Sequence, residues 1–127
     1  MTRIYQGIDI VEVSKFKKVF LKNKNFASDI FTETERHYCL SRNDPYIHFA
    51  GRFAVKEAGL KALGIGLSGI NHVFKEIEVL PNVSGKPMLT FSGWAEKISK
   101  KRRINQFTAS ISHSSQYAVA TVILVGN

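Results

Sequence analysis

Two carboxylates in this chain lie in sequence surroundings where a charge is costly. Asp9 interrupts the apolar run of residues 7–11, and Glu57 lies within the largely apolar helical stretch 53–61. A buried charge is retained only when it is paired, hydrogen-bonded or bound to a metal. Because the two acids come from distant parts of a small chain, they suggest a shared cation. A cation held by two carboxylates is typical of an enzyme that acts on phosphates.

The helix that carries Glu57 also places a base close to this acid. At 100° per residue, Glu57 and Lys61 share one narrow stripe with small residues, which would let another segment approach the helix backbone closely. Taken alone, the pair would be an exposed i,i+4 ion pair worth about 0.2–0.5 kcal/mol, and Asp9 would be a strand-end residue satisfied by backbone amides. The complete motifs around both acids favour the functional interpretation. The small residues of the stripe are Ala50, Ala54 and Gly64.

Size and composition predict one soluble domain over residues 1–127, with 44% hydrophobic residues. The formal net charge of +8 implies an anionic partner, whether nucleic acid, a phosphorylated ligand or an acidic protein. No apolar run approaches the roughly 18 residues of a membrane helix, and the first residues do not resemble a signal peptide. We therefore expect a cytoplasmic protein with no membrane partner. Cys39, the only cysteine, excludes an internal disulfide and a cysteine-based zinc site.

The hydrophobic pattern predicts an α+β fold in which helices pack on a largely antiparallel sheet. Ser14 is a candidate cap for a lysine-rich helix. Thr32 and Glu35 form a capping-box pattern for a helix to about residue 41, and the segment 64–66 supplies a left-handed stop for a helix over 46–63. A final hairpin, apolar on both faces, favours contact with another subunit. We also expect a short helical turn at 26–31, a helix at 93–103, and strands at 3–13, 73–80, 88–91, 107–113 and 116–125.

The ordered set of motifs resembles that of the holo-[acyl-carrier-protein] synthases, the short group of the 4′-phosphopantetheinyl transferase family. The matching segments follow the family's order and cover nearly the whole chain. One short acid-containing motif is weak, but an ordered set is specific. The segments are GIDIVE at 7–12, FTETE at 31–35, FAGRFAVKEA at 49–58, KALG at 61–64, IEV at 77–79, GKP at 85–87, SISH at 110–113 and YAVA at 117–120.

This resemblance implies that Asp9 and Glu57 bind a catalytic Mg²⁺ and that coenzyme A is the co-substrate. A carrier-protein serine would attack the pantetheine-side phosphate, and adenosine 3′,5′-bisphosphate would leave. Lys61 and His113 are expected to contact the phosphates of coenzyme A. Lys56, which points toward a different stripe, belongs to the same motif and is a further candidate for binding it. The catalytic set is then Glu57, Lys61 and His113. Glu57, acting through a metal-bound water, and His113 are both candidates for taking the serine proton.

The resemblance also implies an acidic acyl carrier protein as partner and a homotrimer with active sites at subunit boundaries. Lys15, Lys18 and Lys22, on the helix that follows Asp9, are predicted to dock that carrier. One alternative is the same chemistry on a polyketide or peptide synthase carrier domain. Another is a small basic nucleic-acid-binding domain, which the net charge and the basic run 100–103 would support. The sequence contains no recognisable nucleic-acid-binding motif, so we expect no nucleic-acid partner.

Overall fold

The computed structural model describes residues 1–65 and 71–127. Its helices and strands occur largely in separate runs along the chain, as is typical of an α+β fold. They are β1 (Arg3–Glu12), α1 (Val13–Lys22), α2 (Phe26–Ile30), α3 (Glu33–Leu40), α4 (Pro45–Leu63), the 3₁₀ helix η1 (Asn71–Glu76), β2 (Ile77–Pro81), β3 (Pro87–Phe91), α5 (Gly93–Lys101), β4 (Ile104–His113) and β5 (Tyr117–Gly126).

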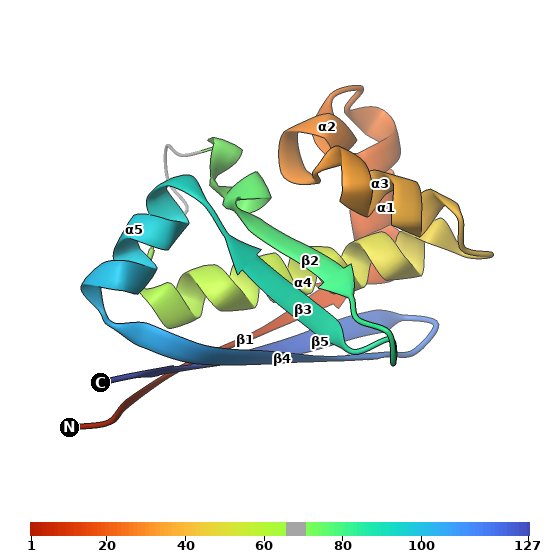
Figure 1. Ribbon diagram of the computed structural model, residues 1–127. Helices are drawn as coiled ribbons and strands as arrows, with labels where there is room; N and C mark the ends of the chain where they lie inside the picture. The colour runs from red at the N-terminus through yellow and green to blue at the C-terminus, as the bar shows by residue number, and fades with distance from the viewer. Residues whose placement is uncertain (66–70) are drawn as a thin grey trace.

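Two antiparallel sheets make up the β-structure. The larger sheet has the strand order β1-β5-β4, and the smaller is the hairpin β2-β3. Figure 1 shows the long helix α4 running across one face of the larger sheet, while α1, α2 and α3 gather at the end of the molecule opposite the two termini. This arrangement confirms the predicted α+β fold with helices on an antiparallel sheet.

The larger sheet has one covered face and one open face. On the side of α4, β5 buries Ala118, Ala120, Val122 and Leu124. On the other side, β1 exposes three isoleucines, Ile4 (71% exposed), Ile8 (58%) and Ile10 (62%). Large aliphatic side chains aligned along one strand form an exposed apolar patch, and such patches mark interaction sites.

Several local predictions are confirmed in detail. Thr32 accepts a hydrogen bond from the Glu35 backbone N–H while the Glu35 carboxylate accepts one from the Thr32 N–H, which completes the capping box of α3. Helix α4 begins at Pro45 and ends before Gly64, whose φ of 73° lies in the left-handed region. Gly66, the other glycine of the predicted stop, lies outside the described residues.

The predicted strand over 73–80 is wrong in its first half. Residues 71–76 form the 3₁₀ helix η1, and the strand covers only Ile77–Pro81. The Lys56 ammonium group donates to the carbonyl oxygen of Phe74 (2.8 Å) within η1 and to that of Ile77 (2.7 Å) at the start of β2. The Phe74 carbonyl is therefore satisfied by a side chain of α4 and needs no neighbouring strand.

Three predicted boundaries also move. Ser14 is not the cap of α1, because β1 leads directly into the helix with Glu12 as N-cap, and the Ser14 hydroxyl donates to the Glu12 carboxylate instead. Helix α5 ends at Lys101, since Arg103 adopts a left-handed φ of 57°. The chain turns there, and β4 starts at Ile104 with an irregular register before Gln106.

Helix α1 is attached to the rest of the molecule by aromatic packing. The buried Phe16 ring lies 5.4 Å from Phe53 and 6.4 Å from Phe31, and Phe20 lies 4.8 Å from Phe49, measured between ring centroids. These contacts fix the apolar side of α1, so its lysines face outward. Among the described residues, no helix is both long and apolar enough to span a bilayer.

Candidate active site

The candidate active site lies where β1 crosses α4. At Gly7 the strand approaches the helix so closely that a Cβ atom would overlap the Ala58 carbonyl oxygen. A side chain there would push the two elements apart, so glycine is required. Asp9 is two residues further along β1 and projects to the same side of the sheet as Gly7. The close crossing therefore brings Asp9 against the side chains of α4.

Asp9 and Lys61 form the ion pair of this site. Lys61 Nζ lies 3.1 Å from Asp9 Oδ1 and donates a second hydrogen bond, 3.0 Å long, to the Ile8 carbonyl oxygen. The Asp9 side chain is 13% exposed, whereas that of Lys61 is 56% exposed. An ammonium group has three protons, so one remains for a further acceptor on the solvent side.

Glu57 is the second acid of the site and is coupled to Asp9. The pKa of Glu57 is raised to about 7, mainly by burial and also by the Asp9 charge and a hydrogen bond to Asp9, while Lys61 opposes the shift. A hydrogen bond between two carboxyl groups requires a proton on one of them. When both are ionised, neither can donate, and the buried Asp9 Oδ2 is left without a hydrogen-bond partner. The pair therefore holds either a proton or another cation.

The donor set fits Mg²⁺. Two carboxylates converge, and one of them presents a buried oxygen that has no protein donor. Within residues 1–65 and 71–127 there is no group of three or more His, Cys, Asp or Glu side chains able to hold a metal. Structural zinc sites need a full tetrahedral set, whereas Mg²⁺ is usually bound by one or two carboxylates plus water and substrate phosphate. Asp9 and Glu57 would hold the ion and leave its other positions for oxygen ligands.

His113 lies apart from the two acids. It ends β4, and its ring centroid is 6.0 Å from that of His48, near the amino end of α4. His48 precedes Glu57 by nine residues, which on an α-helix is about 14 Å. Burial lowers the pKa of His48, and the positive charges of Arg52 and Arg42 lower it further. Within one chain, His113 therefore belongs to a separate basic cluster and not to the Asp9–Glu57 site.

Lys56 also lies away from the site. Its side chain is 0% exposed, and its Nζ lies 2.9 Å from an oxygen of Glu35, which is equally buried. Burial lowers the pKa of Lys56, and the Glu35 charge opposes that shift. The remaining protons of the ammonium group are taken by two backbone carbonyls of the η1–β2 segment. The structure does not bring Lys56 to Asp9, Glu57 or Lys61, and no part of it is open to a phosphate.

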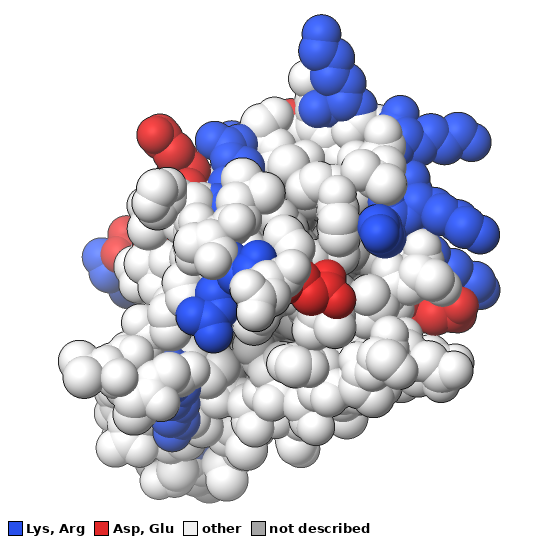
Figure 2. All heavy atoms as spheres, turned by 90° about the vertical axis from the view of Figure 1, so that its right-hand side faces the viewer, with Lys and Arg blue, Asp and Glu red and all other residues white. Residues whose placement is uncertain are grey.

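Lys15, Lys18 and Lys22 are exposed on α1. Lys15 Nζ lies 3.6 Å from Glu12, and both side chains of that pair are exposed. Figure 2, which faces the end of the molecule formed by α1, α2 and α3, shows lysine and arginine side chains projecting over the upper part of this surface. The helix begins directly after β1, so this basic surface starts a few residues from Asp9.

Two partnerships of these residues were missed by sequence reasoning. The sequence pattern predicts Glu35 only as part of a capping box, but its second oxygen accepts from the Val79 backbone N–H and its first pairs with Lys56. His48 was given no role, yet it is the neighbour of His113. No local signal reveals either contact, because each joins segments more than 20 residues apart in the sequence.

Comparisons with known proteins agree with this geometry. The family model described as the 4′-phosphopantetheinyl transferase superfamily matches residues 6–122. The chain is 39% identical to the holo-[acyl-carrier-protein] synthase of Caldanaerobacter subterraneus subsp. tengcongensis, over 97% of this chain and 95% of that protein. It is 42% identical to the corresponding synthase of Syntrophotalea carbinolica, over 95% and 94%.

Solved structures of the same kind share the fold. A Chronobacterium ammoniagenes synthase in complex with coenzyme A superposes with a TM-score of 0.84 at 30% identity, covering 98% of each chain. A Bacillus anthracis holo-(acyl-carrier-protein) synthase, described in complex with coenzyme A (3′,5′-ADP), gives a TM-score of 0.79 at 34% identity over the full length of both chains. The chain belongs to the 4′-phosphopantetheinyl transferase superfamily. It is a phosphopantetheinyl transferase of the holo-[acyl-carrier-protein] synthase kind, as its motifs predicted.

Proposed function

We propose that this enzyme transfers 4′-phosphopantetheine from coenzyme A to a serine of an apo acyl carrier protein of fatty acid biosynthesis. The observation that carries the proposal is the convergence of Asp9, Glu57 and Lys61 where β1 crosses α4. Relatives about 40% identical over nearly their whole length are holo-[acyl-carrier-protein] synthases, and similar solved structures contain coenzyme A. A carrier domain of a polyketide or peptide synthase is the alternative target.

Asp9 and Glu57 are proposed as the Mg²⁺ ligands. When bound, the ion offsets the charge of the pyrophosphate as the bond between phosphorus and the leaving oxygen breaks. Lys61 is held by Asp9 and by the Ile8 carbonyl, which leaves one proton of its ammonium group for a phosphate oxygen. The serine oxygen forms the new bond to phosphorus, and adenosine 3′,5′-bisphosphate leaves.

The serine proton has two candidate acceptors, Glu57 and His113. Glu57 lies beside Asp9 in the candidate site itself, and a carboxylate there is suited to take up a proton. His113 of the same chain lies beside His48, and His48 precedes Glu57 by nine residues on α4. We therefore propose Glu57 as the acceptor, with His113 and its basic neighbours binding the nucleotide phosphates.

The proposal is tested by the intact mass of an apo carrier protein incubated with the enzyme, coenzyme A and Mg²⁺. Wild type should add one phosphopantetheine, and Asp9→Asn and Glu57→Gln should each reduce the rate by about 10³-fold or more. Glu96→Gln, at an exposed acid of α5, is the matched control and should behave as wild type. Wild-type rates in either active-site variant under limiting Mg²⁺ would contradict the assignment. Equal rates with a polyketide carrier would favour the alternative target.

We also propose a homotrimer in which a neighbouring subunit completes each active site. Two observations support it: the apolar outer face of β1, with Ile4, Ile8 and Ile10 exposed, and the separation of His113 from the two acids within one chain. Both would be explained if the isoleucine face meets another subunit and one chain's His113 reaches its neighbour's Asp9–Glu57 site.

A mixing experiment tests the shared site. Asp9→Asn and His113→Ala proteins, each weakly active alone, should regain part of the wild-type rate when unfolded together and refolded, because some mixed trimers contain one intact site. Light scattering would give the mass of the assembly. A fully active monomer, or no recovery in trimers proven to be mixed, would refute the arrangement.

The exposed lysines of α1 are proposed to attract the acidic carrier. Charges at the rim of an interface mainly change the association rate and its salt dependence. Lys15→Glu combined with Lys18→Glu should raise the KM for the carrier about tenfold and flatten its dependence on salt. The KM for coenzyme A should stay the same. The control is the same charge change at two exposed lysines elsewhere, Lys86→Glu with Lys97→Glu, which should leave both constants unchanged. Loss of coenzyme A binding in the α1 variant would mean that this helix serves the other substrate.

A further inference from the structure

A second concave and strongly basic region lies at the opposite end of β1 from Asp9. A cavity of about 510 Å³ opens there between the start of β1, the end of α5 and the end of β5. Tyr5 lines it and lies four residues before Asp9, a separation of about 13 Å along the strand. The cavity is therefore distinct from the candidate active site. Its lining residues are Met1, Arg3, Tyr5, Ile98, Lys101, Arg102, Arg103 and Asn127.

The fold shapes this cavity through the turn from α5 to β4. Arg103 has a left-handed φ of 57°, which is uncommon for a residue other than glycine. The Asn127 backbone N–H donates to the Arg103 carbonyl oxygen at 3.3 Å. Gly126 lies against the same turn, because a Cβ atom there would come within 2.5 Å of the Arg102 carbonyl oxygen. The turn is thus fixed against the end of β5, and this contact fixes the backbone position of Arg102.

No acidic side chain balances the positive charge in this cavity. Four cationic side chains line it, and no aspartate or glutamate does. Among the described residues, the ion pairs involve Lys15, Lys56, Lys61 and Lys100, and none of the four lining cations. Four positive charges around one space repel one another unless an anion lies between them.

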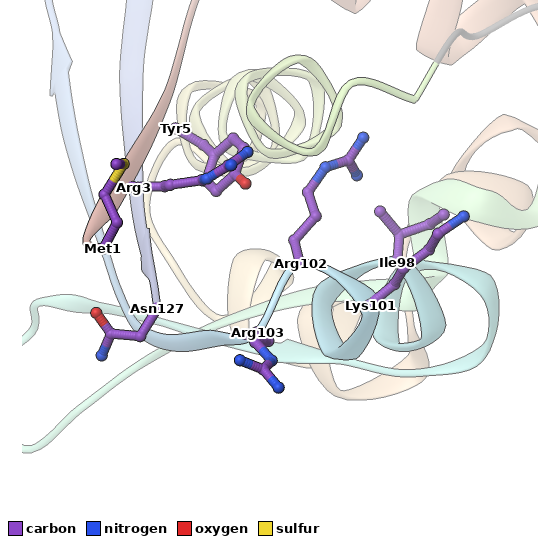
Figure 3. Close-up of a pocket in the computed structure, with 8 residues that line it drawn as sticks. All are labelled: Met1, Arg3, Tyr5, Ile98, Lys101, Arg102, Arg103 and Asn127. Atoms are coloured by element: carbon purple, nitrogen blue, oxygen red, sulfur yellow. The ribbon is translucent and has the colours of Figure 1, made fainter.

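Among the residues that line the cavity, Arg102 has a buried donor atom without a hydrogen-bond partner. Its Nη1 is buried and has no hydrogen-bond partner, whereas its Nη2 would lie 3.3 Å from a Cβ on Gly64, at the carboxyl end of α4. Its guanidinium carbon lies 5.9 Å from the centre of the Tyr5 ring. In Figure 3, Arg102 extends from the α5–β4 turn toward α4, while Arg3 and Tyr5 lie across the cavity on β1. Arg102 as a whole is only partly buried, and a guanidinium with an unused donor is suited to a phosphate oxygen, which it can bind through two hydrogen bonds.

We propose that this cavity binds a small phosphorylated molecule with at least two negative charges, with Arg102 and Arg3 as its main contacts. Its volume lies within the range of about 300–1,000 Å³ that is typical of small-molecule sites and exceeds the size of a single phosphate. A nucleic acid strand is disfavoured because the lining cations surround a cavity, whereas strand-binding proteins present cations along an open surface. The flanking Lys101 and Arg103 strengthen the field that attracts the anion.

Inorganic pyrophosphate is the probe, titrated into the full-length protein in the presence of EDTA so that no divalent metal supports binding at Asp9 and Glu57. The readout is ¹H–¹⁵N NMR of backbone amides and of the arginine side chains. We expect saturable shifts at Tyr5, Arg102 and Asn127, and a loss of affinity of about tenfold or more in Arg102→Gln. Lys97→Gln removes the same charge from the same helix outside the cavity lining and should bind as wild type.

Arg3→Gln provides a second variant, since Arg3 is exposed and its replacement should not disturb folding. It should weaken pyrophosphate binding at least threefold, again without effect from Lys97→Gln. The proposal would be overturned by shifts centred on Lys61 or His113, or by equal weakening in Lys97→Gln, which would indicate diffuse attraction. Tighter binding of a single-stranded oligonucleotide than of pyrophosphate, with shifts spread along the outside of α5, would also overturn it.

Discussion

Helix α4 carries two lysines five residues apart, and each meets a carboxylate in a different way. Lys56 and Glu35 are both 0% exposed, and the other hydrogen-bonding capacity of the pair is taken by the backbone of Thr32, Phe74, Ile77 and Val79. Lys61 and Asp9 are partly exposed, and Asp9 Oδ2 is buried with no partner.

This difference in burial and in hydrogen-bond partners indicates that one pair is structural and the other belongs to the candidate active site. A buried polar network whose members are all satisfied fixes one arrangement of its elements, here α3, α4 and β2. A site that leaves a buried oxygen unpaired and raises the pKa of Glu57 to about 7 is held ready for a proton or a cation. The presence of a charged residue in a motif therefore does not by itself show whether that residue is structural or catalytic. The number of its hydrogen-bonding groups that have partners does.

The largest expected effect comes from breaking the buried pair. Lys56→Met leaves the Glu35 carboxylate buried without its cation, which should lower the free energy of unfolding by about 3–5 kcal/mol. Urea denaturation measures it, with Lys86→Met, at an exposed turn lysine, as the control. The double variant Lys56→Met with Glu35→Leu should recover much of the loss. If Lys56→Met instead kept full stability but lost coenzyme A binding, Lys56 would belong to the active site.

The second effect concerns Lys61 and should show the opposite pattern. Lys61→Met should slow phosphopantetheine transfer by about 10²-fold, because a positioned cation is lost from the phosphate site. The free energy of unfolding should change by less than about 1 kcal/mol, since the Lys61 side chain is 56% exposed. Transfer rates and urea curves on the same samples measure both quantities. A large loss of stability with normal transfer would mean that both lysines are structural.

The third effect is a pH dependence of the metal-free protein. The folded-state pKa of Glu57 is raised to about 7 from an ordinary value of 4.5. Between these two pH values the folded state binds more protons than the unfolded state, so its stability should fall as the pH rises through this range. Thermal unfolding in EDTA at several pH values measures the slope, and Glu57→Gln should reduce it. Added Mg²⁺ should restore stability mainly above pH 7, because the ion competes with the proton.

Much of the fold could be predicted from the sequence because its signals are local. The capping box at Thr32 and Glu35, the start of α4 at Pro45 and its end at Gly64 each depend on residues within a few positions of one another. The two acids could be identified because each interrupts an apolar motif, and the structure brings them together. Their roles, like those of Lys61 and His113, stay predictions until the variants are measured.

The remaining features depend on contacts between distant segments. The alternation of residues 73–80 is typical of a strand, but residues 71–76 form a 3₁₀ helix in which the Phe74 carbonyl accepts from Lys56 of α4, a contact that the alternation does not predict. A helical wheel placed Lys56 off the catalytic stripe but could not identify Glu35 as its partner. Gly7 is a further example of a feature that depends on a distant segment. The structure shows that a side chain at this position would overlap Ala58 of α4, and the local sequence does not predict that contact.

The smallest expected effect lies at the edge of the buried network. The Thr32 hydroxyl caps α3 and donates to Glu78 at 2.7 Å. Thr32→Ala removes both contacts and should cost about 1 kcal/mol of unfolding free energy. Glu35 should stay in place, because Lys56 and the Val79 N–H still hold its carboxylate. Transfer activity should therefore be unchanged. Thr34→Ala, at an exposed position of the same helix, is the control and should cost less than about 0.5 kcal/mol. A loss of several kcal/mol in Thr32→Ala would mean that the network around Glu35 depends on the cap, and that its stability does not come mainly from the Lys56 pair.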